Sequence, residues 1–288
     1  MHIYKEYDKE SLDRQYNNRL NAPDHEIHLA GWESLSRKAE KEYSVIKDIK
    51  YGADNHEKLS IFPSQQPNAK TLVFIHGGYW YKHVASDFYL ISEAFREYGF
   101  TTVLIDYPLM PDYSMSQLVL SCRKAILWLN QHLLEYNGNP DQMYVSGHSA
   151  GAHLAVMMMT TNWLQFNNTL KADAIKGVCA ISGLYNLIPI QLCYVNEILK
   201  MDKETALLNS PVQLLPETHC HLILAVGAME TAEYLSQSRE LLDRWTKQEA
   251  SIELIEIDGL NHFSILETML NSSSNLHKAM CLLMKVKI

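Results

Sequence analysis

From residue 71 onward, short apolar runs alternate with helical patterns. The apolar runs occur at 71–75, 101–105, 143–146, 177–181 and 221–226, and a sixth segment, 251–257, alternates between apolar and polar residues. The helical patterns occupy 85–98, 114–136, 150–163 and 232–248, and a last one follows residue 263. Apolar runs this short are typical of strands that are buried on both faces rather than of helices. The alternation therefore predicts an α/β protein with a mostly parallel central sheet and helices on both faces.

Two parts of the chain depart from this alternation. Residues 1–45 are polar and periodic and predict an N-terminal helical segment, whereas 43–51 and 58–62 predict a strand hairpin. Residues 184–215 lie between two expected strands but are irregular and apolar. An insertion there would lie near the strand ends, where ligands bind in open α/β sheets. We therefore expect a single domain over 1–288 that carries a small cap insertion.

Composition excludes several classes of partner. The formal net charge is −8, with 25 Lys and Arg against 33 Asp and Glu, which argues against nucleic acid because that partner needs a basic surface. No apolar run approaches the ~18 residues of a membrane span, and the polar N-terminus lacks the apolar stretch of a signal peptide. Five widely spaced cysteines without a CxxC pair indicate reduced thiols. We expect a cytoplasmic protein that binds neither nucleic acid nor membranes, and a homodimer is left open.

The sequence GHSAG at 147–151 is a candidate nucleophile motif. It follows the expected strand 143–146 and opens a helical pattern, which is the context that G-x-S-x-G requires. A turn this tight strains the backbone of Ser149, and bulk at the flanking positions would clash, so glycine is needed there. The turn would expose the Ser149 hydroxyl above the sheet and aim the Ala150 amide at the site. Ser149 is therefore the candidate nucleophile of an α/β-hydrolase fold.

The sequence HGGYW at 76–80 follows the expected strand 71–75. Two glycines after a buried strand allow backbone N–H groups to approach a ligand closely. Upstream of the nucleophile motif, such a segment is expected to supply the second half of an oxyanion hole. We predict that the amides of Gly78 and Tyr79 act there together with Ala150. We expect His76 to be structural.

The general base is expected to follow the nucleophile and the acid along the chain. This order leaves His219, His221, His262 and His277 as candidates. His219 and His221 lie at the far end of an expected strand, and His277 lies inside the last helical pattern. His262 comes directly after the last strand, in a loop at the catalytic edge, and is therefore our candidate base.

The acid is expected in the segment that follows the strand 221–226. Glu230 is our candidate because its carboxylate would fix the His262 tautomer, and Glu is an allowed third member in this fold. Glu233, one helical turn further, and Asp258, close to His262 in sequence, stay open as alternatives. Asp106 is interpreted as a structural turn residue, because an acid at that point would have the wrong chain order.

With these residues in place, the chain resembles the kynurenine formamidase (arylformamidase) branch of the α/β-hydrolases. The resemblance covers most of the chain and is carried by residues 12–19, 76–80, 147–154, 182–187 with 210–211, and 230–238. One departure concerns the acid, because the family usually carries Asp where this chain has Glu230. The longer side chain is chemically competent but moves the carboxylate.

The resemblance implies hydrolysis of N-formyl-kynurenine to kynurenine and formate. A small formyl group needs only a tight acyl pocket, and the aromatic leaving part would lie under the cap. The expected pocket residues are Trp80, Tyr81, His148 and Tyr185. The expected partner is a small acyl substrate, and no metal or other cofactor is expected.

Two other functions stay open because fold and motifs give acyl transfer to water, not the substrate. One is a general carboxylesterase or thioesterase that acts on small acyl groups. The other is a binding protein that keeps the hydrolase fold without catalysis, but such proteins usually lose the Ser or His that this chain retains.

Overall fold

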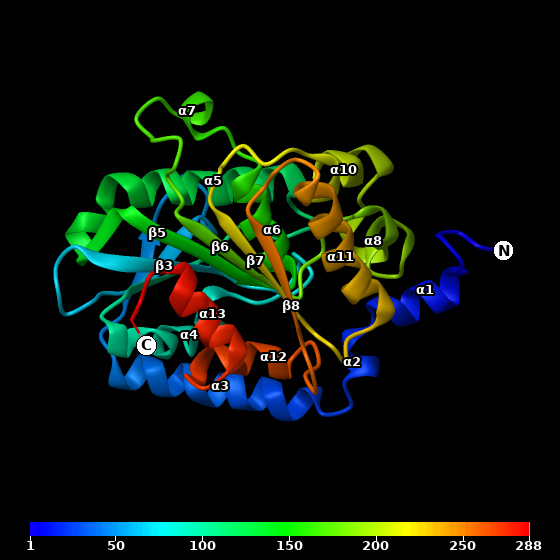
Figure 1. Cartoon of the computed structure of the whole chain (residues 1–288), viewed down its shortest axis with the longest axis horizontal. Coiled ribbons are helices and arrows are strands. Elements are labelled where there is room, and N and C mark those ends of the chain that lie inside the picture. Colours follow the sequence, from blue (N-terminus) through cyan, green and yellow to red (C-terminus); the bar gives the residue numbers. More distant parts are fainter. Residues whose placement is uncertain (288) are drawn as a thin grey trace.

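The computed structural model describes residues 1–287 around one eight-stranded sheet (Figure 1). The strands are β1 (Ile46–Lys50), β2 (Lys58–Phe62), β3 (Ala69–Ile75), β4 (Thr101–Ile105), β5 (Gly138–His148), β6 (Gly177–Ile181), β7 (His221–Gly227) and β8 (Ile252–Ile257). Their order across the sheet is β1-β2-β4-β3-β5-β6-β7-β8, and all pairs from β4 to β8 are parallel. The antiparallel pairs are β1 with β2, the predicted hairpin, and β2 with β4. The predicted mostly parallel sheet is confirmed.

The helices are α1 (Lys9–Tyr16), α2 (Asn18–Asn21), α3 (His25–Glu42), α4 (Ile91–Ala94), α5 (Met115–His132), α6 (Ala150–Met159), α7 (Trp163–Phe166), α8 (Ile188–Leu192), α9 (Asn196–Leu199), α10 (Lys203–Leu208), α11 (Ala232–Thr246), α12 (Ser264–Glu267) and α13 (Asn275–Leu283). Short 3-10 turns are η1 (Ala85–Phe88), η2 (Arg96–Tyr98), η3 (Leu133–Tyr136), η4 (Pro211–Gln213) and η5 (Thr268–Leu270). One buried cluster joins the sheet to α5, α6 and α11, and a second joins the opposite face to α3, α4 and α13 (Figure 1). Helices therefore cover both faces.

Two expected helices are interrupted. The segment predicted over 150–163 forms α6 and α7, because Thr160 and Thr161 return hydroxyl hydrogen bonds to Met157 O and Asn162 then caps α7. The segment predicted over 85–98 forms η1, α4 and η2 instead of one helix, and ends at Gly99, whose φ is 76°. Hydrophobic periodicity predicts one continuous helix in each segment. Capping side chains and a residue with a left-handed backbone end these helices earlier than predicted.

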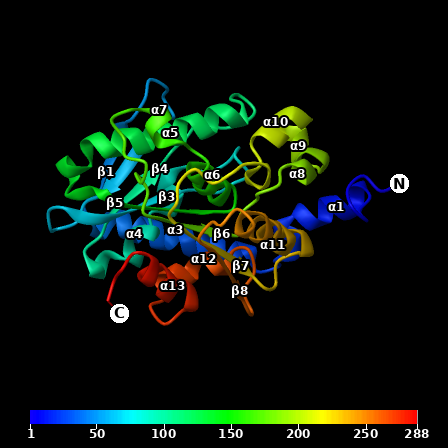
Figure 2. The same cartoon turned by 45° about the horizontal axis from the view of Figure 1, so that its top comes forward.

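The insertion between β6 and β7 carries α8, α9 and α10. Gln237 on α11 holds its base, because its Oε1 accepts the N–H groups of Tyr185 and Asn186, both at 2.7 Å. The inserted helices lie beside α1 at one end of the molecule (Figure 2), where Asp13 Oδ1 accepts the Tyr194 N–H at 2.6 Å. This insertion and the N-terminal segment thus meet above one edge of the sheet.

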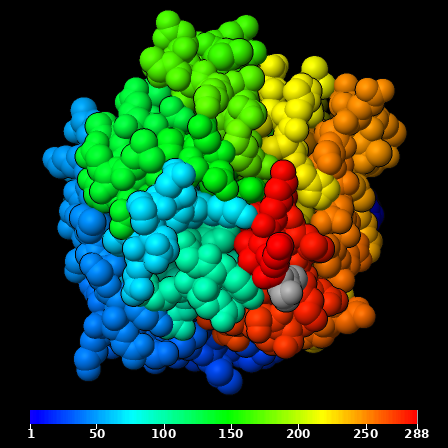
Figure 3. Space-filling model, turned by 60° about the vertical axis from the view of Figure 1, so that its left-hand side comes forward, coloured from blue at the N-terminus to red at the C-terminus, as the bar shows by residue number. Residues whose placement is uncertain are grey.

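The C-terminal helix packs on the opposite side of the sheet. In Figure 3 the red C-terminal segment lies beside the cyan-to-teal segment that includes α4. The ring of His277 stacks on Phe95 with 4.8 Å between centroids, and Lys70 Nζ donates to the carbonyl of Met284 at 2.8 Å. None of the helices within residues 1–287 is both long enough and apolar enough to cross a membrane.

Candidate active site

Ser149 lies in the sharp turn between β5 and α6. Its φ of 58° and ψ of −120° are the strained values that the motif predicts. A Cβ on Gly147 would lie 2.3 Å from Gly151 O, and one on Gly151 would lie 2.0 Å from Ile75 O. Only glycine allows so close an approach at these two positions. The Ser149 N–H donates to Ile181 O at 2.8 Å, which fixes the turn against β6.

A chain of hydrogen bonds joins Ser149, His262 and Glu230. His262 Nε2 lies 3.0 Å from Ser149 Oγ, and its Nδ1 lies 2.7 Å from Glu230 Oε2. All three side chains are buried. With a carboxylate at Nδ1, the ring donates from Nδ1 and presents its Nε2 lone pair to the serine hydroxyl. This arrangement allows His262 to accept the serine proton.

Two further donors hold the Glu230 carboxylate. Its Oε1 accepts the Ser182 hydroxyl at 2.5 Å and the Gly227 N–H at 2.9 Å.

The alternative acids lie elsewhere. Glu233 pairs with Lys5 Nζ at 2.9 Å, and Asp258 is exposed with no hydrogen bond to His262 within the described chain. Glu230 is thus the carboxylate that faces the imidazole.

The segment after β3 brings backbone amides toward Ser149. A Cβ on Gly77 would lie 2.7 Å from His148 O and 3.2 Å from Ser149 Cβ, so this loop touches the nucleophile turn. Gly78 has a φ of 108° and Tyr79 a φ of 49°. Within residues 1–287, the amides of Gly78, Tyr79 and Ala150 donate to no protein acceptor. Free N–H groups of this kind suit a developing oxyanion.

His76 and His148 are buried neutral rings on either side of this loop. His76 stacks on Tyr107 at 4.4 Å, and burial lowers its pKa to about 4. Burial, followed by the charge of His262, holds the pKa of His148 well below its usual range. A neutral His148 donates from Nε2 to the carbonyl of His262 at 2.8 Å and so fixes the backbone that carries the base.

A phenol network that the sequence did not predict adjoins the triad. The Tyr234 ring lies 4.8 Å from the His262 ring, and its hydroxyl lies 2.9 Å from that of Tyr79 and accepts Asn18 Nδ2 at 2.8 Å. Burial raises the pKa of Tyr234, and its hydrogen-bonding neighbours, Ser149 among them, act in the opposite direction. Tyr234 lies four residues after Glu230, but no sequence pattern distinguished it from an ordinary core tyrosine of α11.

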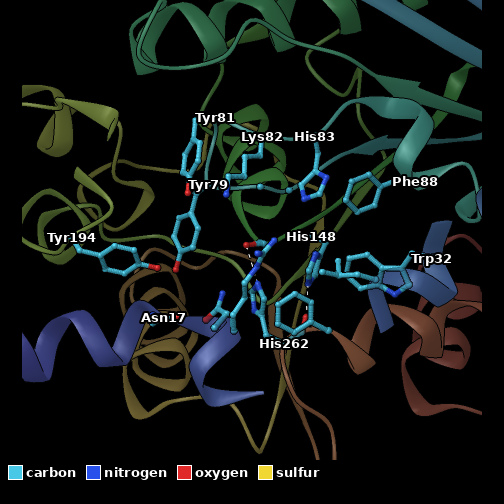
Figure 4. A pocket seen from close by; sticks show the side chains of 17 residues that line it. Asn17, Trp32, Tyr79, Tyr81, Lys82, His83, Phe88, His148, Tyr194 and His262 are labelled. Atoms are coloured by element: carbon cyan, nitrogen blue, oxygen red, sulfur yellow. Dashed lines mark hydrogen bonds between the residues drawn. The ribbon is translucent and has the colours of Figure 1, made fainter. Parts of the chain in front are cut away.

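The pocket above Ser149 has a volume of about 300 Å³. Tyr79, Tyr81 and Tyr194 lie on one side of His148 and His262, and Trp32 and Phe88 lie on the other (Figure 4). The pocket is therefore lined by aromatic rings on two sides of the nucleophile, as suits a substrate with an aromatic part.

Of the four expected pocket residues, the structure brings Tyr81 and His148 to the pocket but not Trp80 or Tyr185. Trp80 is fully buried, and its Nε1 donates to His153 Nδ1 at 3.2 Å. Tyr185 is also fully buried at the base of the insertion. Trp80 has a φ of 60°, the Tyr185 N–H is held by Gln237 Oε1, and both rings pack in the buried core behind the lining. Asn17, Asn18 and Arg19 from the N-terminal segment line the pocket instead.

The sequence of the chain is similar to known hydrolases over most of its length. The sequence model of the BD-FAE family matches residues 59–227. Kynurenine formamidase of Danio rerio is 30% identical over 96% of this chain and 97% of its own, and that of Salmo salar is 29% identical over 96% of each chain. The expected resemblance is confirmed.

Solved structures confirm the α/β-hydrolase fold. A putative thioesterase from Silicibacter sp. TM1040 superimposes with a TM-score of 0.81 at 23% identity, over 92% of this chain and 97% of its own. An arylesterase structure superimposes with a TM-score of 0.66 at 18% identity, over 90% of this chain and 91% of its own. At these identities the likeness concerns the fold alone.

Proposed function

The chain belongs to the BD-FAE family as a kynurenine formamidase-like α/β-hydrolase, and on this premise we propose that it cleaves small acyl groups from aryl amides through an acyl-enzyme on Ser149. It is a serine hydrolase with arylformamidase-like or esterase activity. The finer proposal is a Ser149–His262–Glu230 triad. The observation that carries it is the continuous hydrogen-bond chain from Ser149 Oγ to the Glu230 carboxylate.

In the first half-reaction, Ser149 Oγ attacks the acyl carbon while His262 Nε2 takes its proton. Glu230 holds the imidazole in the productive tautomer and stabilises the imidazolium that forms. The negative charge that develops on the acyl oxygen is bound by the amides of Gly78, Tyr79 and Ala150. His262 then donates its proton to the leaving nitrogen, and the amine departs.

In the second half-reaction, a water molecule takes the place of the amine. His262 removes a proton from this water, which attacks the acyl carbon on Ser149. Collapse of the second tetrahedral intermediate returns the proton to Ser149 Oγ and releases the acid. For a formamide, the products are formate and the aryl amine, and we propose N-formyl-kynurenine as a substrate, by analogy with the formamidases of the two fish.

Ester hydrolysis is the second candidate. The fold neighbours include a putative thioesterase and an arylesterase, and acyl transfer from oxygen or sulfur needs the same serine, base and oxyanion donors. An ester is intrinsically easier to cleave because its leaving group needs less protonation. A formamidase with this site is therefore expected to hydrolyse activated acetyl esters as a side reaction.

A substrate panel on wild type and Ser149→Ala tests this proposal. We expect turnover of N-formyl-kynurenine and of p-nitrophenyl acetate by wild type, and a loss of at least ~10³-fold in both with Ser149→Ala. The control is Ser86→Ala, an exposed serine, which should keep wild-type rates. A fluorophosphonate probe should add one mass label to wild type and none to Ser149→Ala. Turnover of the ester alone would favour the esterase, and near-wild-type activity of Ser149→Ala would refute the nucleophile.

The cytoplasmic location stays a prediction. All five cysteines are free thiols, four of them buried, as suits a reducing compartment. Burial raises the pKa of the Cys179 thiol to about 12, so we assign this thiol no role in the chemistry.

A further inference from the structure

Two tyrosine hydroxyls join the loop between β3 and η1 to the helix that follows the acid. Tyr79 on the loop and Tyr234 on α11 meet at 2.9 Å between their hydroxyl oxygens. Beyond them, the Tyr79 hydroxyl lies 2.6 Å from Tyr16 O, and the Tyr234 hydroxyl lies 2.8 Å from Asn18 Nδ2. These three contacts form one hydrogen-bond chain, and both of its ends belong to the N-terminal segment.

The donors and acceptors fix the direction of this hydrogen-bond chain. Tyr16 O can only accept, so Tyr79 donates its one hydroxyl proton to it. The Tyr79 oxygen must then accept the proton of Tyr234. With that proton used, the contact between Tyr234 and Asn18 needs a proton from the side-chain amide, so Nδ2 and not Oδ1 faces the phenol. The loss of either hydroxyl therefore interrupts the whole chain of bonds.

Tyr234 contacts the base as well as the loop. It is fully buried, and its ring centre lies 4.8 Å from that of His262, with 61° between the ring planes. Its ring thus packs against the imidazole while its hydroxyl holds Tyr79. Tyr79 supplies one of the proposed oxyanion amides, and its φ of 49° is a left-handed value that persists only where the surroundings hold it. One side chain on α11 therefore reaches two parts of the site.

The N-terminal ends of the hydrogen-bond chain are themselves held. Tyr16 is fully buried, and its hydroxyl accepts Gln237 Nε2 at 3.0 Å. Asn18 is buried and is the first residue of α2. Asn17, which caps this helix, accepts the Leu20 N–H at 3.1 Å. Because both ends are fixed, the bonds between them can hold the loop in one position.

We propose that Tyr234 and Tyr79 are positioning residues for the reaction, and that their hydrogen-bond chain to the N-terminal segment holds the Tyr79 amide toward the acyl oxygen. This inference rests on the proposed function, because it places that amide in the oxyanion hole. Neither hydroxyl needs to touch the substrate. An oxyanion donor acts on the transition state more than on the bound substrate, so loss of the hydroxyls should lower kcat and leave KM nearly unchanged.

Phenylalanine substitutions test this role, because each removes a hydroxyl and keeps the ring. We expect Tyr79→Phe and Tyr234→Phe each to lower kcat on p-nitrophenyl acetate about ten-fold, while KM stays within about two-fold. Because the two hydroxyls act through one chain of bonds, the double variant should also lose about ten-fold, not the ~100-fold of independent effects. A loss confined to KM, or losses that multiply in the double variant, would overturn the proposal.

The matched control is Tyr89→Phe. Tyr89 is also buried, its hydroxyl lies 2.7 Å from Ser60 Oγ, and it does not line the active-site pocket. This variant removes a buried hydroxyl bond of the same kind and should keep kcat within about two-fold of wild type. Thermal unfolding verifies that the variants are folded at the assay temperature. An equal kcat loss in Tyr89→Phe and Tyr234→Phe would assign the effect to general destabilisation and overturn the positioning role.

Hydrogen exchange separates this inference from the proposed function, because it needs no turnover. The amides of Tyr81 and Lys82 donate to Gly78 O at 3.2 and 3.1 Å, so their exchange reports whether the loop keeps its hydrogen bonds. Their exchange should be about ten-fold faster in Tyr234→Phe than in wild type or Tyr89→Phe. Faster exchange in an enzyme that cleaves neither formamides nor esters would remove the proposed reaction and keep the support of the loop. Unchanged exchange in Tyr234→Phe would remove that support, whatever the enzyme hydrolyses.

Discussion

Glu230 accepts three donors at once, and this makes it a rigid support for His262. Ser182 Oγ and the Gly227 N–H hold one carboxylate oxygen, and the imidazole N–H meets the other. A carboxylate held by three donors needs no reorganisation when the ring becomes charged. The extra methylene of Glu relative to Asp is accommodated because the side chain folds back onto the Gly227 amide of its own turn.

Glu230→Gln is expected to lower kcat by about 10³–10⁴-fold, because an amide NH₂ facing Nδ1 favours the wrong imidazole tautomer. The measurement is steady-state kinetics on p-nitrophenyl acetate, with circular dichroism to verify the fold. Asp258→Asn is the control and should stay within two-fold of wild type, since Asp258 is exposed and, within the described residues, the His262 Nδ1 bonds to Glu230 instead. The reverse order of the two effects would move the acid to Asp258.

The loop between β3 and η1 carries two of the three proposed oxyanion donors, Gly78 and Tyr79. Three successive residues, Gly78, Tyr79 and Trp80, have positive φ, which turns their amides away from the regular direction of a strand. The loop is fixed by the Lys82 N–H on Gly78 O and by the Met110 N–H on Trp80 O at 2.8 Å. Its strained backbone persists because these bonds and the buried Trp80 ring hold it.

Gly78→Ala is expected to lower kcat by about 10²–10³-fold, because an added Cβ would meet Lys82 O at 2.5 Å and displace an oxyanion donor. The comparison is Gly99→Ala, which also places alanine at a positive φ, here 76°, but with no atom within 4 Å. Both variants pay for alanine at a positive φ, and Gly78→Ala should lose more thermal stability because its Cβ also clashes, so kcat is compared at a temperature where both are folded. Equal kcat values in the two variants would show that strain alone, and not the donor, explains the loss.

The N-terminal segment is the second element that shapes the site. Tyr16 donates to Glu233 Oε2 at 3.2 Å and accepts Gln237 Nε2 at 3.0 Å, so α1 is fastened to the helix that follows the acid. Thr231 Oγ1 donates to Gln15 O at 2.7 Å in the same contact. A segment more than two hundred residues away in sequence thereby supplies Asn18 and Arg19 to the pocket.

Across the whole molecule, the parallel sheet gathers the site at one edge. The carboxyl ends of β3, β5, β7 and β8 lead in turn to the glycine loop with the proposed oxyanion donors, to Ser149, to Glu230 and to His262. The topology therefore brings together groups that are far apart in the chain, and Tyr194 of the insertion and Asn17 to Arg19 of the N-terminal segment complete the pocket lining.

Buried neutral histidines make the stability of the whole molecule depend on pH. Burial lowers the pKa of His76 and of His153 to about 4 from 6.5. The unfolded chain therefore binds more protons than the folded one between these values. The free energy of unfolding is therefore highest above about pH 6.5, where both rings are neutral in either state. It falls as the pH drops toward 4, because protonation of these rings favours the unfolded chain.

When the pH is lowered from 7.5 to 5, each of these two rings is expected to reduce the free energy of unfolding by about 2 kcal/mol, because the unfolded chain takes up the proton more readily. Urea unfolding at the two pH values measures the change. His153→Gln should reduce the difference between the two pH values, whereas His219→Gln, at an exposed position, should not. An unchanged pH difference in His153→Gln would contradict the assignment of a neutral buried ring.

The residue pattern alone predicts the alternation of strands and helices, the turn around Ser149, the glycine loop at 77–78 and the candidate base His262 after the last strand. These features are local, because a strand ending in Gly147 and a helix opening at Ala150 leave the backbone of Ser149 few other conformations. Packing between distant segments sets which carboxylate faces His262, keeps Trp80 and Tyr185 out of the pocket lining, and brings Arg19 to the pocket and the Tyr234 ring against His262. The direction of these side chains depends on packing between segments far apart in the chain, and no local pattern encodes that packing.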